Sequence, residues 1–468
     1  MAANMNKTRT AYIGLSLELY LSTVGDSLIA WRNAFEQWTA KLATVSDVQY
    51  SKLCFTDADV AQAVSEIKQK NIDVLVLSAV SYTPSMLIIP ALQELQLPVM
   101  VWSTQDSAVI SDTYKPEDLT DNHTVQGIQD VTNVMLRKRI DFEIVTGHWQ
   151  DQRTIDRLAA GLQTIRAAEA AKKIRVLALG GFFAGMGDFE FDPEALRRQW
   201  GVDYIDIGAK EFLAAVNDVS DKEIDTILAD DRERFEILPS LQIGTHRESI
   251  RRYLAIKVLL QKYNANAFTM NFTNLLSPDF GQLPFYAINR LMAEGIGYAG
   301  EGDILRAALM RQLVEVAGEA NFTEIYTVDF KRDLFFMSHM QECSIAIARR
   351  DRKVVLKQMP FWVKGVPDYT GMFFTAEPGD YTLVSMTPDA DGRFRLIAFT
   401  GTVPDLPVLE TYDRAYWLLR PTLPVNELLD KYSLAGGPHH LSAVPGKRIG
   451  EIAALAAKLG FDFYDLDK

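Results

Sequence analysis

The first 175 residues alternate short apolar runs with longer segments in which apolar residues recur at the spacing of a helix. The runs at residues 73–77 (Asp-Val-Leu-Val-Leu) and 98–102 (Pro-Val-Met-Val-Trp) are almost wholly apolar. Strands of this kind are typical of a parallel sheet that helices cover on both faces. We therefore predict a doubly wound α/β layer here, and a second α/β layer from residues 173–179 (Lys-Ile-Arg-Val-Leu-Ala-Leu) onward.

The character of the sequence changes after about residue 320. Short β-branched or aromatic segments, separated by Asp, Gly and Pro, follow at residues 325–329, 334–338, 354–356, 381–386 and 394–400. Segments of this length and spacing predict a mostly antiparallel sandwich or barrel. We therefore expect an N-terminal α/β domain at residues 1–172, a central α/β domain at residues 173–319 and a C-terminal β-rich domain at residues 320–468.

Composition excludes some classes of partner. A formal net charge of −13 argues against a nucleic-acid partner, because phosphate binding requires clustered Lys and Arg. The two cysteines, Cys54 and Cys343, cannot form a disulfide framework and fit a reducing compartment. No uninterrupted apolar run reaches the roughly 18 residues that a membrane span requires, and residues 10–15 are too soon interrupted by Glu18 to form a signal sequence. We expect a cytoplasmic protein without a membrane partner.

A glycine-rich stretch, residues 180–188, follows the apolar run at 173–179. A strand followed by glycines suggests a dinucleotide or phosphate loop, but the G-x-G-x-x-G pattern fails because Phe182 stands where its second glycine is expected. We interpret the glycines as allowing the backbone to turn closely around something small, with Met186 as an apolar contact.

Glutamates and histidines in the C-terminal half form a candidate metal site. Glu301, Glu324 and His339 are too far apart in sequence to share one helix face, so they can meet only through the fold. A further imidazole comes from the pair His439-His440, which follows a Gly-Gly-Pro turn. Two carboxylates and two imidazoles suit Mn²⁺, Co²⁺ or Mg²⁺ better than they suit a thiolate-preferring metal.

Glu301 lies where a helix is expected to begin, just before residues 303–316, and a glycine flanks it on each side. The helix dipole favours an anion at this position, and the glycines permit close approach of a ligand. The alternative interpretation is that Glu301 and Asp303 only complement the dipole.

The sequence resembles the L-arabinose isomerase family along nearly its whole length. The motifs that carry the resemblance lie, in the same order, at residues 145–151 (Val-Thr-Gly-His-Trp-Gln-Asp), 267–272 (Ala-Phe-Thr-Met-Asn-Phe), 282–284, 290–295, 297–303 (Gly-Tyr-Ala-Gly-Glu-Gly-Asp), 338–340, 392–395 and 435–440 (Ala-Gly-Gly-Pro-His-His).

The resemblance implies two Rossmann-like α/β domains before the β-rich domain, and an enzyme that interconverts an aldose and a ketose. It also implies a divalent metal, usually Mn²⁺, held at the matching positions Glu301, Glu324, His339 and His440. The two glutamates would then form the proton-transfer pair. The resemblance further implies a homo-oligomer of packed trimers, such as a hexamer, with active sites between subunits.

Several expected sugar contacts depart from the family pattern. Leu17 replaces a sugar-contacting glutamine, unless Glu18 takes its place; Gln126 stands where a histidine is expected, and Gly187 where an arginine is expected. Other expected contacts keep an apolar or aromatic character, namely Tyr82, Met186, Phe272 and Met340. Because a buried hydroxyl left without a partner is costly, we expect an isomerase of a pentose or hexose for which L-arabinose is only the first candidate.

Two other functions stay open at this point. Tandem α/β domains also build sugar receptors, so the chain could be a non-catalytic sugar-binding or regulatory protein. The same metal site could also serve a sugar epimerase or dehydratase.

Overall fold

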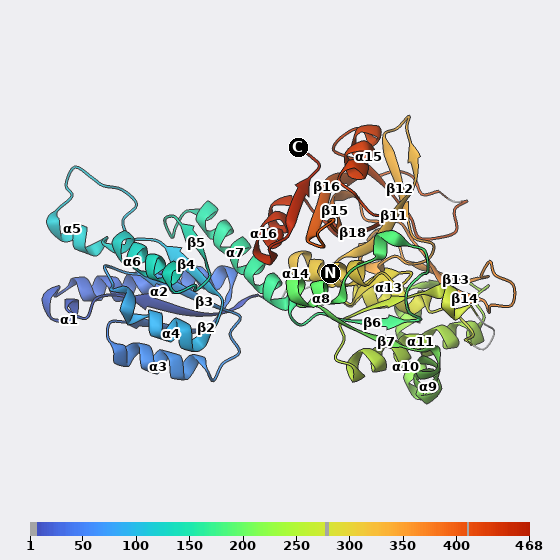
Figure 1. Cartoon of the computed structure of the whole chain (residues 1–468), viewed down its shortest axis with the longest axis horizontal. Helices are drawn as coiled ribbons and strands as arrows, with labels where there is room; N and C mark the ends of the chain where they lie inside the picture. The colour runs from blue at the N-terminus through green and yellow to red at the C-terminus, as the bar shows by residue number, and fades with distance from the viewer. Residues whose placement is uncertain (1–6, 277–279, 410) are drawn as a thin grey trace. The chain divides into compact units, whose positions relative to one another are not determined.

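The computed structural model describes residues 7–276, 280–409 and 411–468. The described chain divides into two compact units, one ending at Arg166 and one beginning at Ala167 (Figure 1). The first unit contains a five-stranded parallel sheet, and the second combines a four-stranded parallel sheet with a barrel. None of the helices in these described ranges is long and apolar enough to cross a membrane.

The first unit is built on a parallel sheet whose strand order is β2-β1-β3-β4-β5. Its strands are β1 (Arg9–Leu15), β2 (Asp47–Cys54), β3 (Val74–Ala79), β4 (Val99–Ser103) and β5 (Phe142–Thr146). Its helices are α1 (Tyr20–Thr23), α2 (Ser27–Val45), α3 (Asp57–Ile67), α4 (Ile89–Leu95), α5 (Pro116–Asp121) and α6 (Thr124–Arg137), and the 3₁₀ turn η1 (Ser85–Leu87) precedes α4. Helix α7 (Gln152–Ala171) belongs to this unit up to Arg166 and continues into the second.

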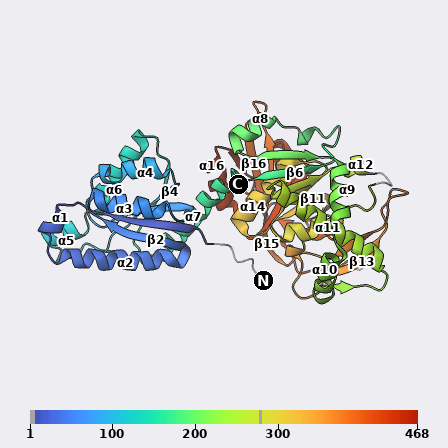
Figure 2. The same cartoon turned by 90° about the horizontal axis from the view of Figure 1, so that it is seen from below.

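Alternate residues of the central strands belong to two separate apolar cores, one on each face of this sheet. Ile13 and Leu77 pack with α3, α4 and α6, whereas Tyr12 and Val76 pack with α2 and α7 (Figure 2). Every residue of β3 and β4 is buried, which explains why these runs carry so few polar side chains. The predicted parallel α/β layer is confirmed, and its Rossmann-like detail stays a prediction.

The second unit begins with a parallel sheet of order β10-β9-β6-β7. Its strands are β6 (Arg175–Leu179), β7 (Asp203–Ile207), β9 (Ala267–Met270) and β10 (Gly297–Gly300). Its helices are α8 (Pro193–Ala195), α9 (Ala209–Asp218), α10 (Asp221–Arg234), α11 (Ile243–Lys262), α12 (Phe272–Leu275), α13 (Phe285–Ala293) and α14 (Ile304–Ala317), with the 3₁₀ turn η2 (Gly187–Phe189) and the π-turn η3 (Leu196–Trp200).

The rest of the second unit is mostly antiparallel, as predicted, and forms a closed barrel rather than a sandwich. Strands β15-β18-β11-β12-β17-β16 follow one another, and β16 pairs with β15 to close the ring. The strands are β11 (Asn321–Asp329), β12 (Leu334–Ser338), β15 (Gly379–Pro388), β16 (Phe394–Val403), β17 (Trp417–Pro421) and β18 (His440–Pro445), with β19 (Asp462–Asp465) added in parallel to β16. A separate small sheet joins β14 (Tyr369–Phe373), β13 (Val355–Met359) and β8 (Glu236–Ile237), and the remaining elements are η4 (Ile345–Ile347), α15 (Val425–Leu434) and α16 (Ile449–Leu459).

Helix α14 connects the parallel sheet to the barrel. It packs against β9 and β10 of the sheet and against β15 and β18 of the barrel. Ala299 of β10, Leu305 of α14 and Phe322 of β11 are fully buried in one apolar core that runs through both parts. The turn that joins β10 to α14, which carries Glu301, is thereby held beside the barrel.

Candidate metal and active site

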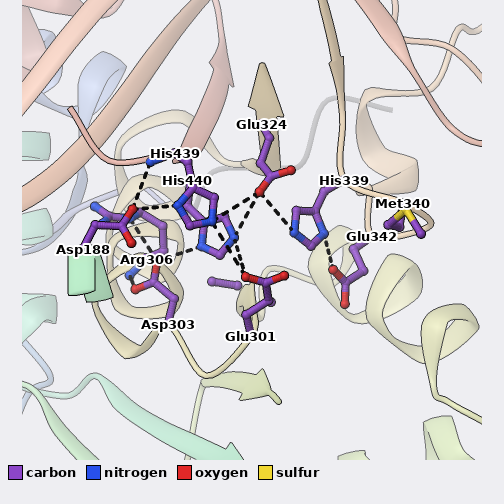
Figure 3. A network of polar contacts seen from close by, with 12 residues as sticks. Asp188, Glu301, Asp303, Arg306, Glu324, His339, Met340, Glu342, His439 and His440 are labelled. Carbon is purple, nitrogen blue, oxygen red and sulfur yellow. Dashed lines mark hydrogen bonds and ion pairs between the residues drawn. The ribbon is translucent and has the colours of Figure 1, made fainter. Parts of the chain in front are cut away.

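Pairing of the barrel strands brings three of the four predicted ligands together. Glu324 lies on β11, where it is directly opposite His440 of β18 on one side and Ser338 of β12 on the other. His339 follows Ser338 immediately. Because side chains of directly paired residues point to the same face, Glu324 and His440 lie on one face of the sheet. His339 lies just beyond the end of β12, and Figure 3 shows the glutamate between the two imidazoles.

Glu301 reaches the same place from the turn between β10 and α14. Its φ of +64° is left-handed, a conformation that non-glycine residues seldom adopt and that recurs at functional sites. Gly302, with a φ of +86°, has no room for a side chain, because a Cβ atom there would lie 2.5 Å from the carbonyl oxygen of Gly181. The helix itself begins at Ile304, and Asp303 caps it by accepting a hydrogen bond from the backbone N–H of Arg306 at 2.9 Å.

The four predicted ligands lie close together around His440 and Glu324. Nε2 of His440 lies 3.5 Å from Oε1 of Glu324 and 3.8 Å from Oε2 of Glu301. Nε2 of His339 lies 3.6 Å from the same oxygen of Glu324. Both imidazoles are buried, and the glutamate side chains are 14% and 16% exposed. The structure thus gathers from four separate segments the residues that the resemblance had singled out.

A third imidazole, His439, also faces the two glutamates. Its Nε2 atom lies 3.7 Å from Oε2 of Glu301 and 3.5 Å from Oε1 of Glu324, and its side chain is 38% exposed. The His439-His440 pair stands out in the sequence, but only its second member was predicted to be a ligand. Consecutive residues of an extended strand point to opposite sides, but His439 precedes β18, in a turn, so both rings can face one point.

Each imidazole has a carboxylate on its other ring nitrogen. Nδ1 of His440 is 3.0 Å from Oδ2 of Asp303, and Nδ1 of His439 is 2.7 Å from Oδ2 of Asp188. Nδ1 of His339 pairs with Glu342, which also accepts a hydrogen bond from the hydroxyl of Tyr298. These carboxylates orient the rings and leave Nε2 turned toward the glutamates, an arrangement that is common around bound metals.

Asp188 and Glu342 were not predicted from the sequence as members of the site, and Asp303 was considered only as a partner of the helix dipole. Glu342 follows His339 by three residues and Asp303 follows Glu301 by two, so proximity in sequence was a usable signal for both. Asp188 comes from a distant segment, and only the fold brings it to His439.

The two glutamates differ in their tendency to be ionised. Burial raises the pKa of Glu301, but its contact with His439 and the charge of the other two imidazoles outweigh burial and bring this pKa below its ordinary value. Burial likewise raises the pKa of Glu324, and the imidazoles offset this only in part, so its pKa stays above the ordinary value. Glu301 is therefore the more persistent anion, and Glu324 takes up a proton more readily.

The two buried imidazoles also differ. Burial lowers the pKa of His440 to about 4, although Asp303 opposes this effect. Burial acts in the same direction on His339, but the carboxylates of Glu342 and Glu324 overcome it and raise the pKa of His339 to about 9. At neutral pH His440 is therefore an uncharged ring whose Nε2 can accept a cation, whereas His339 holds a proton.

Two buried atoms between the glutamates and the imidazoles are suited to bind a cation. Among the described residues, neither Oε2 of Glu301 nor Nε2 of His440 has a hydrogen-bond partner. Buried polar atoms without a partner are costly, and a divalent ion would satisfy both. The donor atoms of Glu324, His339 and His440 all lie within 4.8 Å of one another, as do those of Glu301, His439 and His440. The mixture of carboxylate oxygen and imidazole nitrogen suits a borderline-hard divalent metal.

Three models of one protein family match the chain, and together they span most of it. Their descriptions are L-arabinose isomerase N-terminal domain at residues 20–173, central domain at residues 193–319 and C-terminal domain at residues 319–461. The L-arabinose isomerase of Serratia proteamaculans is 30% identical over 379 residues, which cover 77% of this chain and 74% of that protein. The chain belongs to the L-arabinose isomerase family. It is accordingly an aldose–ketose isomerase, that is, an intramolecular oxidoreductase.

Other members of the L-arabinose isomerase family are also similar to this chain over most of its length. The L-arabinose isomerase of Erwinia tasmaniensis is 28% identical over 407 residues, and that of Yersinia pseudotuberculosis is 29% identical over 406 residues; each match covers 83% of this chain and 79% of the relative. Among solved structures, a periplasmic solute-binding protein from Actinobacillus succinogenes with bound D-allose aligns at 14% identity and a TM-score of 0.17, covering 66% of this chain and 92% of that chain. That similarity is too low to bear on the fold.

The residues predicted to contact the sugar fall in both units. In the second unit, Met186 is half-buried just before η2, Phe272 begins α12 and lies edge-on to Phe183, and Met340 follows His339 with a left-handed φ of +45°. In the first unit, Leu17 follows β1, Tyr82 follows β3 with its ring 5.5 Å from that of His123, and Gln126 is exposed on α6. Contact of these residues with a sugar stays a prediction.

Proposed function

We propose that this member of the L-arabinose isomerase family depends on a divalent metal held by Glu301, Glu324, His339 and His440. The observation that carries the proposal is a pair of buried atoms, Nε2 of His440 and Oε2 of Glu301, that have no hydrogen-bond partner among the described residues. The carboxylates on the Nδ1 atoms of His339 and His440 support it, because they fix each ring with Nε2 toward the centre. Mn²⁺ is the first choice of ion, with Co²⁺ and Mg²⁺ as alternatives.

The reaction moves one hydrogen between C1 and C2 of the sugar and one proton between the two attached oxygens. A base must take the proton from C2 and return it to C1, and negative charge develops on the oxygens meanwhile. When bound, the divalent ion would supply electrostatic stabilisation of that charge, as in an enediolate.

We propose that Glu301 mainly holds the cation and that Glu324 transfers the proton. The lowered pKa of Glu301 suits a residue that stays anionic and holds a cation. The raised pKa of Glu324 suits a residue that accepts a proton from C2 and then gives it to C1, because the best proton carrier has a pKa near the working pH. A glutamate cannot be both a tight ligand and an efficient base, so we expect Glu324 to hold the ion less tightly than Glu301.

The substrate in this proposal is L-arabinose, with L-ribulose as product, or a related pentose or hexose. The substitutions at Leu17, Gln126 and Gly187 make the related sugars serious candidates. Leu17 and Gly187 each remove a polar or charged group expected in the family, and Gln126 replaces an expected imidazole with an amide. A site that hydrogen-bonds a sugar hydroxyl can discriminate by several orders of magnitude, and loss of the partner relaxes or redirects that choice.

We also propose the three-domain division at residues 1–172, 173–319 and 320–468, with Rossmann-like detail in the first two domains. The division between the two units after Arg166 and the end of the N-terminal family model at residue 173 support the first boundary. The central and C-terminal family models meet at residue 319, which supports the second. A trimer-based homo-oligomer with active sites between subunits, and a cytoplasmic location, complete the proposal.

The experiment is a panel of aldoses incubated with metal-stripped protein, before and after addition of Mn²⁺, with E301Q as the control. We expect a ketose, identified by NMR, only from the metal-loaded wild-type protein. Formation of no ketose from any aldose would contradict the proposal and favour a sugar-binding protein. An epimer or a dehydrated sugar in place of a ketose would instead indicate an epimerase or a dehydratase, and full turnover by E301Q would contradict the assigned roles.

A further inference from the structure

The glycine-rich stretch at residues 180–188 and the adjoining Phe189 form a loop that contacts the site near both of its ends. Near its start, the backbone N–H of Phe183 donates a hydrogen bond to the carbonyl of Glu301 at 3.2 Å. The close approach of Gly302 to the carbonyl of Gly181 belongs to the same contact. Near its end, Asp188 reaches His439. The loop therefore connects the turn that carries Glu301 to the turn that carries His439.

The contact of Asp188 with His439 is a two-point clamp. The same oxygen, Oδ2, accepts a hydrogen bond from the backbone N–H of His439 at 3.2 Å and from its Nδ1 at 2.7 Å (Figure 3). The neighbouring Phe189 is buried and stacks on the imidazole of His439, with ring centroids 5.0 Å apart and planes 30° apart. Backbone, ring edge and ring face are thus all fixed by two consecutive residues of the loop.

The clamp leaves only one atom of the ring free to act. Nε2 of His439 is turned toward Glu301 and Glu324, at 3.7 and 3.5 Å. The rings of His339 and His440 are not available for proton transfer there, because each would use Nε2 as a ligand and Nδ1 on a carboxylate. His439 is also the most exposed of the three imidazoles, so a substrate can reach it.

We propose that Asp188 is a positioning residue that holds His439 as the proton carrier between the two sugar oxygens. The proposal rests on the isomerase function proposed above. In the aldose-to-ketose direction, the Nε2 proton of His439 passes to O1 as that carbonyl oxygen becomes a hydroxyl. Nε2 then takes the proton of the O2 hydroxyl as that oxygen becomes the new carbonyl. The ring ends as it began, and the proton that Glu324 moves from C2 to C1 completes the balance.

The first test is a double-mutant cycle on turnover with D188A, H439Q and the double variant. Loss of a residue that orients a functional imidazole typically costs about 10- to 100-fold in activity, and we expect a loss of that size in kcat for D188A, with KM little changed. In the H439Q background the same substitution should cost less than about twofold, because Asp188 acts through the ring that is already missing. E190Q, which alters an exposed carboxylate two residues away, serves as the matched control and should keep wild-type turnover. An equal loss from D188A in both backgrounds, or no loss at all, would overturn the proposal.

The second test needs no turnover and therefore separates this inference from the proposed function. Crystal structures of D188A and of the isosteric D188N, each soaked with Mn²⁺, would show where the His439 ring lies. We expect the ring to leave its position in D188A, while His339, His440 and the bound ion stay in place. A His439 ring that keeps its wild-type position in D188A would overturn the inference even if wild-type protein isomerises an aldose. If the ring moves in D188A but wild-type protein turns over no aldose, Asp188 does position His439. The proton-carrier role of His439 is then contradicted together with the proposed function.

Discussion

Asp303 accepts a hydrogen bond from Nδ1 of His440 at 3.0 Å, and both side chains are fully buried. The same carboxylate pairs with Arg306 and caps α14, so one residue fixes both the helix start and the imidazole. The turn before this helix carries Glu301. The position of two proposed ligands therefore depends on a single buried carboxylate.

Replacement of Asp303 by Asn should weaken metal binding. The amide can still cap the helix, but it removes the charge that orients and polarises His440, and such partners are worth about 10- to 100-fold in metal affinity. Calorimetric titration with Mn²⁺ measures the effect. D192N, which alters an exposed capping carboxylate at α8, is the matched control and should bind as the wild type does. An unchanged affinity in D303N would show that His440 is not a ligand.

Substitution of Gly300 by Ala should weaken metal binding by displacing His339. A Cβ atom at this position would lie 2.9 Å from Cε1 of His339 and 3.0 Å from a carboxylate oxygen of Glu342, so the imidazole must shift. We expect at least a tenfold loss of Mn²⁺ affinity, which corresponds to about 1.4 kcal/mol. G450A is the control, because a Cβ atom there meets nothing within 4 Å, and alanine suits a helix. Normal Mn²⁺ binding by G300A would contradict the assignment of His339.

Metal binding should release a proton from His339. The neighbouring carboxylates raise its pKa to about 9, so below that pH the ring must lose a proton before Nε2 can bind an ion. The apparent affinity should therefore rise with pH up to about 9, and close to one proton should be released per Mn²⁺ at pH 7. The stability of the metal-free protein should change with pH in the opposite direction to metal affinity. The protonated His339 ring contributes its full stabilisation of the fold below its ordinary pKa of 6.5, and this contribution is lost as the pH rises through 9.

Titrations at pH 7 in buffers of different ionisation enthalpy count the released protons. His440 should contribute none, because burial holds its pKa at about 4. Binding without any proton release would contradict a role for His339 as ligand.

Introduction of arginine at Gly187 should change the choice of sugar without harming the fold. A Cβ atom at this position would meet nothing within 4 Å, so the longer side chain has space. We expect G187R to raise kcat/KM for L-arabinose relative to other aldoses by about tenfold, since a restored polar contact is worth roughly that factor. G244R places the same charge at an exposed position of α11 and should leave the ratio unchanged. An identical sugar ratio in G187R would remove Gly187 from the residues that determine specificity.

Local sequence patterns predicted the classes of secondary structure well. The apolar runs of β3 and β4 indicated strands buried on both faces, and they are. The short segments after residue 320 indicated antiparallel strands, yet they could not distinguish a sandwich from a barrel. That distinction depends on the pairing of β15 with β16, which closes the ring between strands whose patterns would be the same in either architecture.

The candidate site was only partly predictable. Glu301, Glu324, His339 and the His439-His440 pair were named from the sequence as a candidate metal site, and the family resemblance then selected His440 as the fourth ligand. Strand register then explains how Glu324 and His440 meet, since these two residues are directly paired. His339 reaches them from just beyond the end of β12, which register alone does not determine. The clamp between Asp188 and His439 was beyond prediction, because 251 residues separate its two members and no local pattern links them.

Anomalous diffraction at the manganese edge, from crystals of the full-length protein grown with Mn²⁺, would locate the proposed ion. We predict one strong peak between Glu301, Glu324, His339 and His440, within coordination distance of both carboxylates and of both Nε2 atoms, and no such peak in E301Q. Absence of a peak at these residues in the wild-type protein, or a peak at another set of residues, would contradict the account.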